Sequence, residues 1–200
     1  MRWLVVPVLI ALAGCGSLLP TGGPAPDLYT LSPATRFPEG LKRANWQLMI
    51  EEPTAVGGVE SNRIAVQPTP NEIRYFGNVR WVERAPRLIQ GLLVESFERS
   101  RAIAGVERYT VTLKADYLLR VEIRDFQAEL FGEEAPTVHV RLTAKLLRSG
   151  KNDILWTRDF AARAAAGNVT AGNVVAAFDA ALGQVMADIV VATINGPPPS

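Results

Sequence analysis

The sequence predicts a single α+β domain, a two-layer sandwich in which a mostly antiparallel sheet carries two amphipathic helices on one face. Alternation of apolar and polar residues predicts the strands, and apolar residues at helical spacing predict the helices. The composition agrees, because 48% of the 200 residues are hydrophobic and 20% are charged, which supplies enough apolar surface for a packed core. We find no internal repeat and no sign of a second domain.

Three strands are predicted in the second half of the chain. The clearest covers residues 137–147, where apolar residues on one face alternate with polar residues on the other. Residues 119–124 alternate in the same way until Asp125 and Phe126 reverse the parity, which predicts a β-bulge. A third strand at 154–162 completes an antiparallel meander over residues 117–162. Earlier strands are expected at 28–32, 46–51, 63–67 and 72–76.

Two segments have the apolar periodicity of surface helices. The first begins near Pro86, a residue suited to a first helical turn, and runs to Ser100. The second follows Thr170, a residue type that often caps helices, and continues until Asn195 and Gly196 end it. Because the sheet is polar on one side, both helices are expected to pack on its apolar face.

The first fourteen residues have the pattern of a secretory signal peptide. One Arg precedes an apolar run, Trp3 to Ala13, which is shorter than the roughly 20 residues that a spanning helix needs. The run ends in Leu-Ala-Gly-Cys15, which resembles the bacterial lipobox, where the Cys becomes the first residue after cleavage and is lipidated. The alternative is that Cys15 is a small apolar residue in an ordinary signal peptide.

The lipobox divides the chain into four parts. Residues 1–14 are the signal peptide, 15–26 a Gly- and Pro-rich lipidated tether, 27–195 the domain and 196–200 a flexible tail. Each buried CH₂ contributes about 0.8 kcal/mol, so two or three acyl chains would hold the protein firmly on a membrane. Gly16 follows the Cys, and the absence of Asp there favours the outer membrane, with the domain facing the periplasm.

The composition argues against several classes of function. A net charge of +1 without a basic stripe argues against nucleic-acid binding. One Cys and one His leave no disulfide framework and no His-pair or Cys-rich metal site. His139 is expected to be an exposed residue on the polar face of the sheet, and Glu133-Glu134 a solvated turn. We therefore expect no catalytic residue, no metal and no cofactor, and predict that the protein is not an enzyme.

Residues 74–87, which we call the arginine segment, are the candidate partner-binding surface. Arginine interleaved with aromatic residues is the composition of interaction hot spots. The alternative is that Trp81 packs under the first helix as core while the arginines point to solvent. The residues singled out for partner binding are Arg74, Tyr75, Arg80, Trp81, Arg84 and Arg87.

Several short motifs occur in a fixed order along the chain. After the lipobox and the tether, the motifs are Leu-Tyr-Thr-Leu-Ser-Pro from residue 28, Asn-Arg-Ile-Ala-Val from 62, Tyr-Phe at 75 and Asn-Val-Arg-Trp-Val from 78, then Trp156 and Phe160 before the last helix. In this order the motifs resemble a known family, the ABC-type transport auxiliary lipoproteins of the PqiC/YmbA type, and the resemblance spans residues 27–195. Many relatives have a Pro-containing stretch just before the strand that begins with Arg-Ile, and at this place the chain has Gly-Gly-Val-Glu-Ser, residues 57–61.

The resemblance implies a role in lipid transport. Family members are non-catalytic outer-membrane lipoproteins of systems in which an inner-membrane ABC permease and ATPase act with an MCE-domain protein to move lipids and maintain the envelope. The partner is expected to dock on the arginine segment or on the polar face of the sheet. Homo-oligomerisation and phospholipid binding stay open. A second hypothesis is a lipid carrier or envelope-assembly lipoprotein that holds lipid between helices and sheet.

Replacing Cys15 with Ser tests the anchor. We expect Cys15→Ser to abolish incorporation of radiolabelled palmitate, because the hydroxyl cannot take the thiol's place in lipidation, and to release the protein from the membrane fraction. Ser17→Ala is the matched control and should leave both unchanged. Labelling of the Cys15→Ser protein at the wild-type level would contradict the lipobox interpretation.

Overall fold

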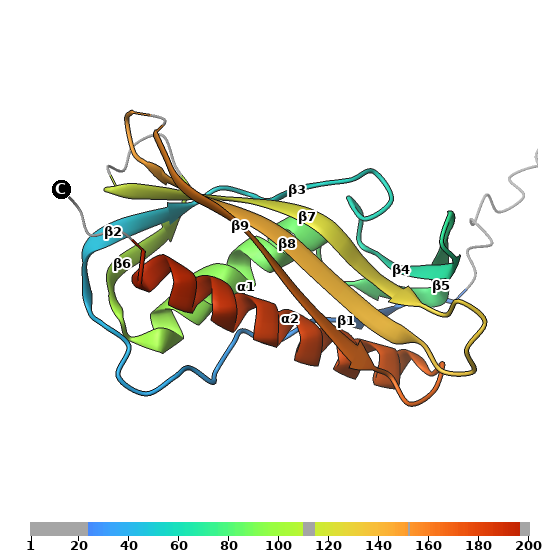
Figure 1. Cartoon of the computed structure of the whole chain (residues 1–200). Coiled ribbons are helices and arrows are strands. Elements are labelled where there is room, and N and C mark those ends of the chain that lie inside the picture. The colour runs from blue at the N-terminus through green and yellow to red at the C-terminus, as the bar shows by residue number, and fades with distance from the viewer. Residues whose placement is uncertain (1–23, 110–114, 152, 197–200) are drawn as a thin grey trace, which may run out of the picture.

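The computed structural model describes residues 24–109, 115–151 and 153–196; the predicted signal peptide, Cys15 and the flexible tail after residue 196 lie outside the described residues. The predicted α+β sandwich is confirmed. Nine strands form one sheet, and two helices cover one of its faces (Figure 1). The strands β1 and β5 and the loop after β7 lie at one end of the molecule, while β2, β6 and the last turn of the second helix lie at the other.

The sheet is built around β7 (Tyr117–Glu129). One edge of β7 pairs antiparallel with β8 (Thr137–Arg148), which in turn pairs antiparallel with β9 (Asp153–Ala165). This confirms the predicted meander. The other edge of β7 is shared along its length by three short strands, β2 (Ala44–Ile50), β3 (Thr54–Ala55) and β4 (Arg63–Thr69), each of them parallel to β7.

The remaining strands extend the sheet from β2 and β4. The strand β5 (Glu72–Trp81) pairs antiparallel with β4, β1 (Asp27–Tyr29) pairs parallel with β5, and β6 (Ile103–Arg108) pairs parallel with β2. The direction of pairing therefore needs a correction: the long pairings are antiparallel, as predicted, but β1, β2, β3, β4 and β6 also make parallel pairs. Alternation shows which face of a strand is wet and carries no information about the direction of its neighbour.

The ends of several strands also differ from the prediction: β9 continues to Ala165 rather than ending at residue 162, because its last residues still pair with β8. The first strand stops at Tyr29 rather than at residue 32, because the chain then leaves the sheet and the Ser32 N–H donates to Asp179 Oδ1 on the last helix (2.6 Å). The strand β5 continues to Trp81 rather than ending at residue 76, because its second half pairs with β1.

Both helices lie where the periodicity predicts them. The first, α1 (Ala85–Ser100), has Pro86 in its first turn, and the second, α2 (Ala171–Ile194), follows Thr170. Thr170 occupies the N-cap position, yet its side chain does not cap the helix, because Oγ1 donates instead to Asn168 Oδ1 (2.7 Å). By length and mean hydropathy (1.8) α2 would suit a membrane span, but half of that stretch is buried, as in the core helix of a globular domain.

The predicted β-bulge in β7 is confirmed. The pairing with β8 shifts between Ile123 and Asp125, so that Arg124 is the extra residue. Before the shift Val121 and Ile123 point into the core, and after it Phe126 and Ala128 do. The bulge therefore turns Asp125 and every second residue after it towards the outer face, away from the helices.

Three aromatic rings join the two layers in the core. Trp81 of β5, Phe126 of β7 and Phe178 of α2 form a triangle with ring centroids 4.8 to 5.8 Å apart. Trp81 is 1% exposed and Phe178 is fully buried. Offset and edge-on contacts of this kind add about 0.5–1.5 kcal/mol each to the gain from burial.

Truncating Phe178 tests this junction. We expect Phe178→Ala to lower the free energy of unfolding by about 3–5 kcal/mol, because the cavity removes contacts with both other rings. Urea unfolding followed by tryptophan fluorescence measures it. Tyr109→Ala is the control, because Tyr109 is 51% exposed and should cost less than about 0.5 kcal/mol. Equal losses for the two variants would contradict the proposed role of the triangle.

Candidate partner-binding surfaces

The arginine segment runs from β5 into the start of α1, and nearby acids or carbonyls hold its guanidinium groups. Arg74 donates to Glu72 (2.6 Å), and Arg87 lies 3.4 Å from Glu83. Arg80 donates to the carbonyl oxygens of Gly77 and Val79. Arg74 and Arg87 are thus paired with acids, whereas Arg80 is held by carbonyl oxygens and keeps its positive charge.

Arg84 has a structural role at the start of α1. Its two terminal nitrogens donate to Glu52 (2.6 Å) and Glu60 (3.2 Å), which lie 32 and 24 residues earlier in the chain. The side chain is 50% exposed, so each pair is worth about 0–1 kcal/mol. Arg84 thus ties the chain on both sides of β3 to the start of the helix and still offers half of its surface to a partner.

The two aromatic residues of the segment are occupied within the fold. Tyr75 donates its hydroxyl to Gly58 O (3.1 Å), and the Arg63 guanidinium stacks 3.7 Å from its ring centroid. Trp81 packs in the core, as the alternative interpretation predicted, and its buried ring offers no contact surface. Partner binding through the other five singled-out residues, of which Arg74, Arg84 and Arg87 are exposed, stays a prediction.

The outer face of β7, β8 and β9 carries a continuous polar network that was not predicted. Its centre is Glu129, which is only 6% exposed. Glu129 Oε2 accepts from Arg163 Nη1 (2.6 Å), and Oε1 lies 3.0 Å from His139 Nδ1 and 3.3 Å from Gln127 Nε2. His139 is therefore half-buried and partnered, which corrects the expectation of an exposed residue; a strand pattern identifies the face of a residue but not its neighbours.

The network continues along the sheet through Asp125. Burial alone would raise the pKa of this carboxyl, but hydrogen bonds from Arg141 and Gln127, with attraction to Arg141 and His139, hold the pKa below its usual value. The same contact raises the pKa of Arg141. Next along the face, Thr143 donates to Asp159 of β9.

Among the described residues we find no arrangement of side chains that is typical of a catalytic site. The hydrogen-bond partners of His139 are a carboxylate and a guanidinium, so no serine or threonine hydroxyl stands in the place of a nucleophile beside it. No group of three or more His, Cys, Asp or Glu side chains suited to a metal occurs among the described residues. Glu133 and Glu134 are exposed between β7 and β8, as predicted.

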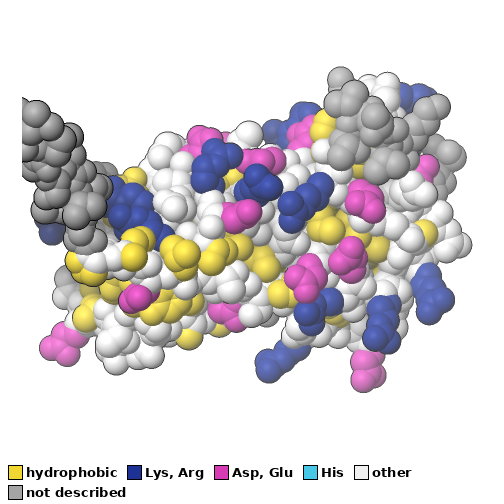
Figure 2. Space-filling view, turned by 180° about the vertical axis from the view of Figure 1, so that it is seen from behind, with side chains coloured by type: hydrophobic (Ala, Val, Ile, Leu, Met, Phe, Trp, Pro, Cys, Tyr) yellow, Lys and Arg dark blue, Asp and Glu magenta, His cyan; other side chains and the backbone are white. Residues whose placement is uncertain are grey.

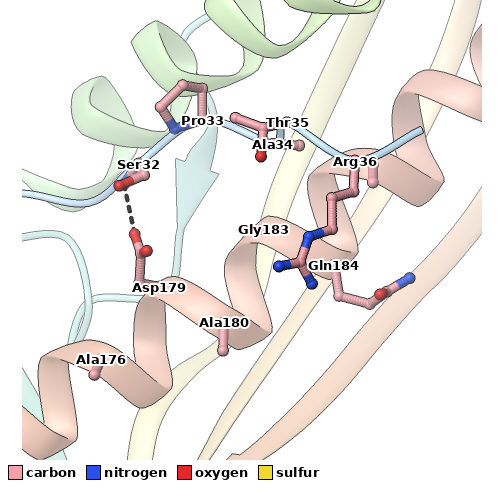
Figure 3. A pocket seen from close by; sticks show the side chains of 11 residues that line it. Ser32, Pro33, Ala34, Thr35, Arg36, Ala176, Asp179, Ala180, Gly183 and Gln184 are labelled. Atoms are coloured by element: carbon pink, nitrogen blue, oxygen red, sulfur yellow. Dashed lines mark hydrogen bonds between the residues drawn. The ribbon is translucent and has the colours of Figure 1, made fainter.

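A shallow groove of about 560 Å³ runs along the outer side of α2, where residues 32–36 cross the helix (Figure 3). Small residues of α2 form its floor, among them Ala176, Ala180 and Gly183. Asp179 closes one part of the groove through its bond with the Ser32 N–H, and Arg36 and Gln184 lie over another part.

Exposed apolar side chains concentrate towards one end of the molecule. In Figure 2, which shows the molecule from behind, they gather on the left half, where the described chain begins. Charges of both signs are spread over the rest of this view. Leu28 of β1 is 61% exposed, and Val82, whose N–H donates to Tyr29 O at the end of β1, is 47% exposed. Both lie close to the start of the described chain, at the tether end.

Comparison with known proteins identifies the class. The profile of the family described as ABC-type transport auxiliary lipoprotein component matches residues 29–190. A crystal structure of a Xanthomonas campestris protein from the family designated DUF330 superposes with a TM-score of 0.79 at 29% identity, covering 84% of this chain and 94% of that one. The chain therefore belongs to the family of ABC-type transport auxiliary lipoprotein components, and the predicted resemblance is confirmed.

Two further comparisons add less. A second crystal structure, of an uncharacterised protein, has the same fold, with a TM-score of 0.61 at 16% identity over 84% of this chain and 97% of that one. An uncharacterised protein of Bradyrhizobium diazoefficiens is 28% identical over 185 residues, which are 92% of this chain and 49% of the relative. The chain thus spans about half the length of that curated relative.

Removing the Arg141 guanidinium tests the network. Because the pKa of Asp125 is depressed in the folded protein, its ionised form stabilises the fold above pH about 4, and this contribution is lost as the pH falls through the folded pKa. Arg141 is 43% exposed, so we expect Arg141→Gln to cost less than about 1 kcal/mol at pH 7.

The pH dependence of this loss is the decisive measurement. In urea unfolding from pH 7 towards pH 2, the deficit of Arg141→Gln should shrink as Asp125 becomes protonated. Arg158→Gln is the control, because Arg158 stacks over Trp156 and forms no ion pair with a described carboxylate. A deficit for Arg141→Gln that is the same at both ends of the range would contradict this account of Asp125.

Proposed function

We propose that this protein is a lipid-anchored, non-catalytic component of an intermembrane lipid-transport system, held at the outer membrane through Cys15 with its domain in the periplasm. Its partners are an MCE-domain protein and the ABC permease and ATPase. The observation that carries the proposal is the family match over residues 29–190, together with the lipobox that precedes it.

The chemistry of the surface supports a non-catalytic role. The most buried carboxylate of the outer face, Glu129, is neutralised by Arg163 and bonded to Gln127, and Asp125 is neutralised by Arg141. Charged groups consumed in this way stabilise the sheet and are not free for general acid or base catalysis. What the domain offers a partner is position, shape and its exposed charges.

The position of the tether supports anchoring at one end of the domain. The described chain begins at the end that carries β1 and β5 (Figure 1). From Cys15 to Pro24 the chain can span at most about 30 Å, so a lipid on Cys15 would hold this end near the membrane surface. The opposite end, with β2 and β6, would then point towards the partners in the periplasm.

The packed interior favours the auxiliary role over the carrier role. Between helices and sheet, Trp81, Phe97, Phe126 and Phe178 are each 2% exposed or less. A lipid between the two layers would have to displace these rings. The groove on α2 lies outside this core and has polar residues along it.

Deletion of the gene for this protein, of the genes for the transporter, and of both tests the shared pathway. We expect equal sensitivity to detergent in all three strains, because removing either part stops the same process. Growth of each strain over a series of detergent concentrations measures it. Sensitivities that add in the double deletion would place the two in separate pathways and overturn the proposal.

Complementation separates anchoring from folding. The wild-type gene should restore resistance fully, whereas Cys15→Ser should restore it only in small part, at equal protein level on an immunoblot. Ser17→Ala is the control for a neutral change beside the lipidation site. Full rescue by Cys15→Ser would show that the function does not need the anchor.

A further inference from the structure

The strand β9 leaves a long edge of the sheet open. It pairs with β8 on one side, from Asp153 to Ala165, and its other side forms no backbone hydrogen bond with any described residue. Figure 1 shows it as the last strand of the meander. The other open edges among the described strands are shorter: three residues in β1, six in β6 and the part of β5 before Val79, which β1 does not cover. Open edges of this length are templates for pairing with another strand.

The hydrogen-bond phase shows which groups of β9 face outward. The Ala166 N–H donates to Pro136 O (2.9 Å), in register with the pairing of Thr137 and Ala165. Hydrogen-bonded and non-bonded pairs alternate along an antiparallel ladder, so the even-numbered residues from 158 to 166 bond to β8. The odd-numbered residues, Asp159, Ala161, Arg163 and Ala165 among them, therefore direct their N–H and C=O groups away from the sheet.

This edge lacks some of the usual protections against pairing, although it carries Arg158, Asp159 and Arg163 and α2 packs against β9. Natural edge strands carry Pro, Lys, inward charges or bulges along the open side. From Thr157 to Ala165 there is neither Pro nor Lys, and the one irregularity of β9 precedes this stretch, at Leu155. Ala161 and Ala165 are exposed and small, so a second strand can approach the backbone closely.

The charges of the outward-facing residues are self-complementary. When two copies pair antiparallel with Ala161 opposite itself, Asp159 of each copy stands opposite the partner's Arg163. Both side chains lie on the outer face, where Asp159 contacts Thr143 and Arg163 contacts Glu129. Arg163 is 55% exposed and Asp159 uses only Oδ1 for Thr143, so both have atoms free for a contact across the interface.

Other registers do not satisfy the same conditions. Sliding one strand by two residues leaves Asp159 opposite an alanine in either direction. A shift of four residues brings two like charges together, Asp159 with the partner's Asp159 or Arg163 with the partner's Arg163. A shift of one residue sets outward-facing backbone groups of one strand against inward-facing groups of the other, so that they cannot form hydrogen bonds. In the favoured register the half-buried Phe160 also lies opposite the partner's Ala162, which pairs a large side chain with a small one.

We propose that a second copy of this chain pairs along β9, with a two-fold axis at Ala161, to form one continuous sheet. A two-fold interface presents the same strand from both copies, which is why one strand can supply both charges of each pair. The proposal concerns self-association only and does not depend on the transport partners. A strand from a different protein on the same edge is the competing outcome.

Cysteine cross-linking of the full-length mature protein in detergent micelles tests the axis. Residues opposite each other in a bonded antiparallel pair have Cα atoms about 5.5 Å apart, within the range of a disulfide. We expect Ala161→Cys, oxidised with copper phenanthroline, to run mostly as a dimer on a non-reducing gel. Ala165→Cys is the matched control, because two copies of residue 165 would be about 26 Å apart; it should cross-link at least about tenfold less than the contact pair.

Mixed samples test the register. On a non-reducing gel, Thr157→Cys and Ala165→Cys should each run as an uncross-linked chain when oxidised alone and form a covalent dimer when mixed, because residue 157 lies opposite the partner's residue 165. Equal cross-linking of Ala161→Cys and Ala165→Cys would overturn the proposal. So would the absence of a cross-linked Ala161→Cys dimer, when complete maleimide labelling of a separate, unoxidised sample shows that the thiol is accessible. So would an Ala161→Cys protein that cross-links in cells only to a different protein.

A charge reversal tests the ion pairs. In the Ala161→Cys protein, Asp159→Arg would place two like-charge pairs across the axis and should weaken dimerisation about tenfold. Asp153→Arg makes the same change on the same strand outside the paired stretch and should have no effect. Circular dichroism checks that both variants are folded, and equal dimerisation of the two would overturn the proposed register.

Discussion

The structure depends on β7 being paired along both of its edges. Three short strands from the first half of the chain pair parallel to one edge, and β8 and β9 extend the sheet from the other. A strand paired on both sides can satisfy its backbone groups without water, and its inward face is free to be apolar along its full length. The two helices pack on either side of this strand, α2 against β8 and β9 and α1 against β2 and β6, and its apolar side chains lie in the core between them.

The bulge at Arg124 joins the core to the polar network. Without the extra residue, the alternation that buries Val121 and Ile123 would also bury Gln127 and Glu129, and Phe126 would face solvent. The shift of register lets one strand serve an aromatic core and an ionised outer face at once. The same logic explains why the polar groups of this face are so completely paired: Glu129 lies at 6% exposure, where an unpaired carboxylate would be costly.

The sequence predicts those features that repeat along the chain, and not those that depend on distant neighbours. Periodicity identifies both helices, the meander and the bulge. It misses β3, which is two residues long, and β6, where Gly105 interrupts the pattern, and it cannot give the direction of the parallel pairs. The network is missed for the same reason, since Glu129, His139 and Arg163 meet only through the register of three strands. Arg84 likewise reaches acids far away in sequence.

Together the two proposals constrain how the domains lie on the membrane. If copies pair along β9 with the axis at Ala161, the axis lies four residues from the end of the strand that adjoins the loop after β7, the end at which the described chain begins. Because the two copies of β9 run antiparallel, the ends at which the two described chains begin point in opposite directions along the shared sheet, and so do the β2 and β6 ends. Both tethers, each able to span about 30 Å, can reach one membrane when the paired sheet lies along its surface, whereas the arrangement with β2 and β6 pointing away from the membrane holds for a single anchored copy. Anchoring two copies to one surface also raises their local concentration, so that a short run of edge hydrogen bonds and two ion pairs needs only modest intrinsic affinity to hold them together.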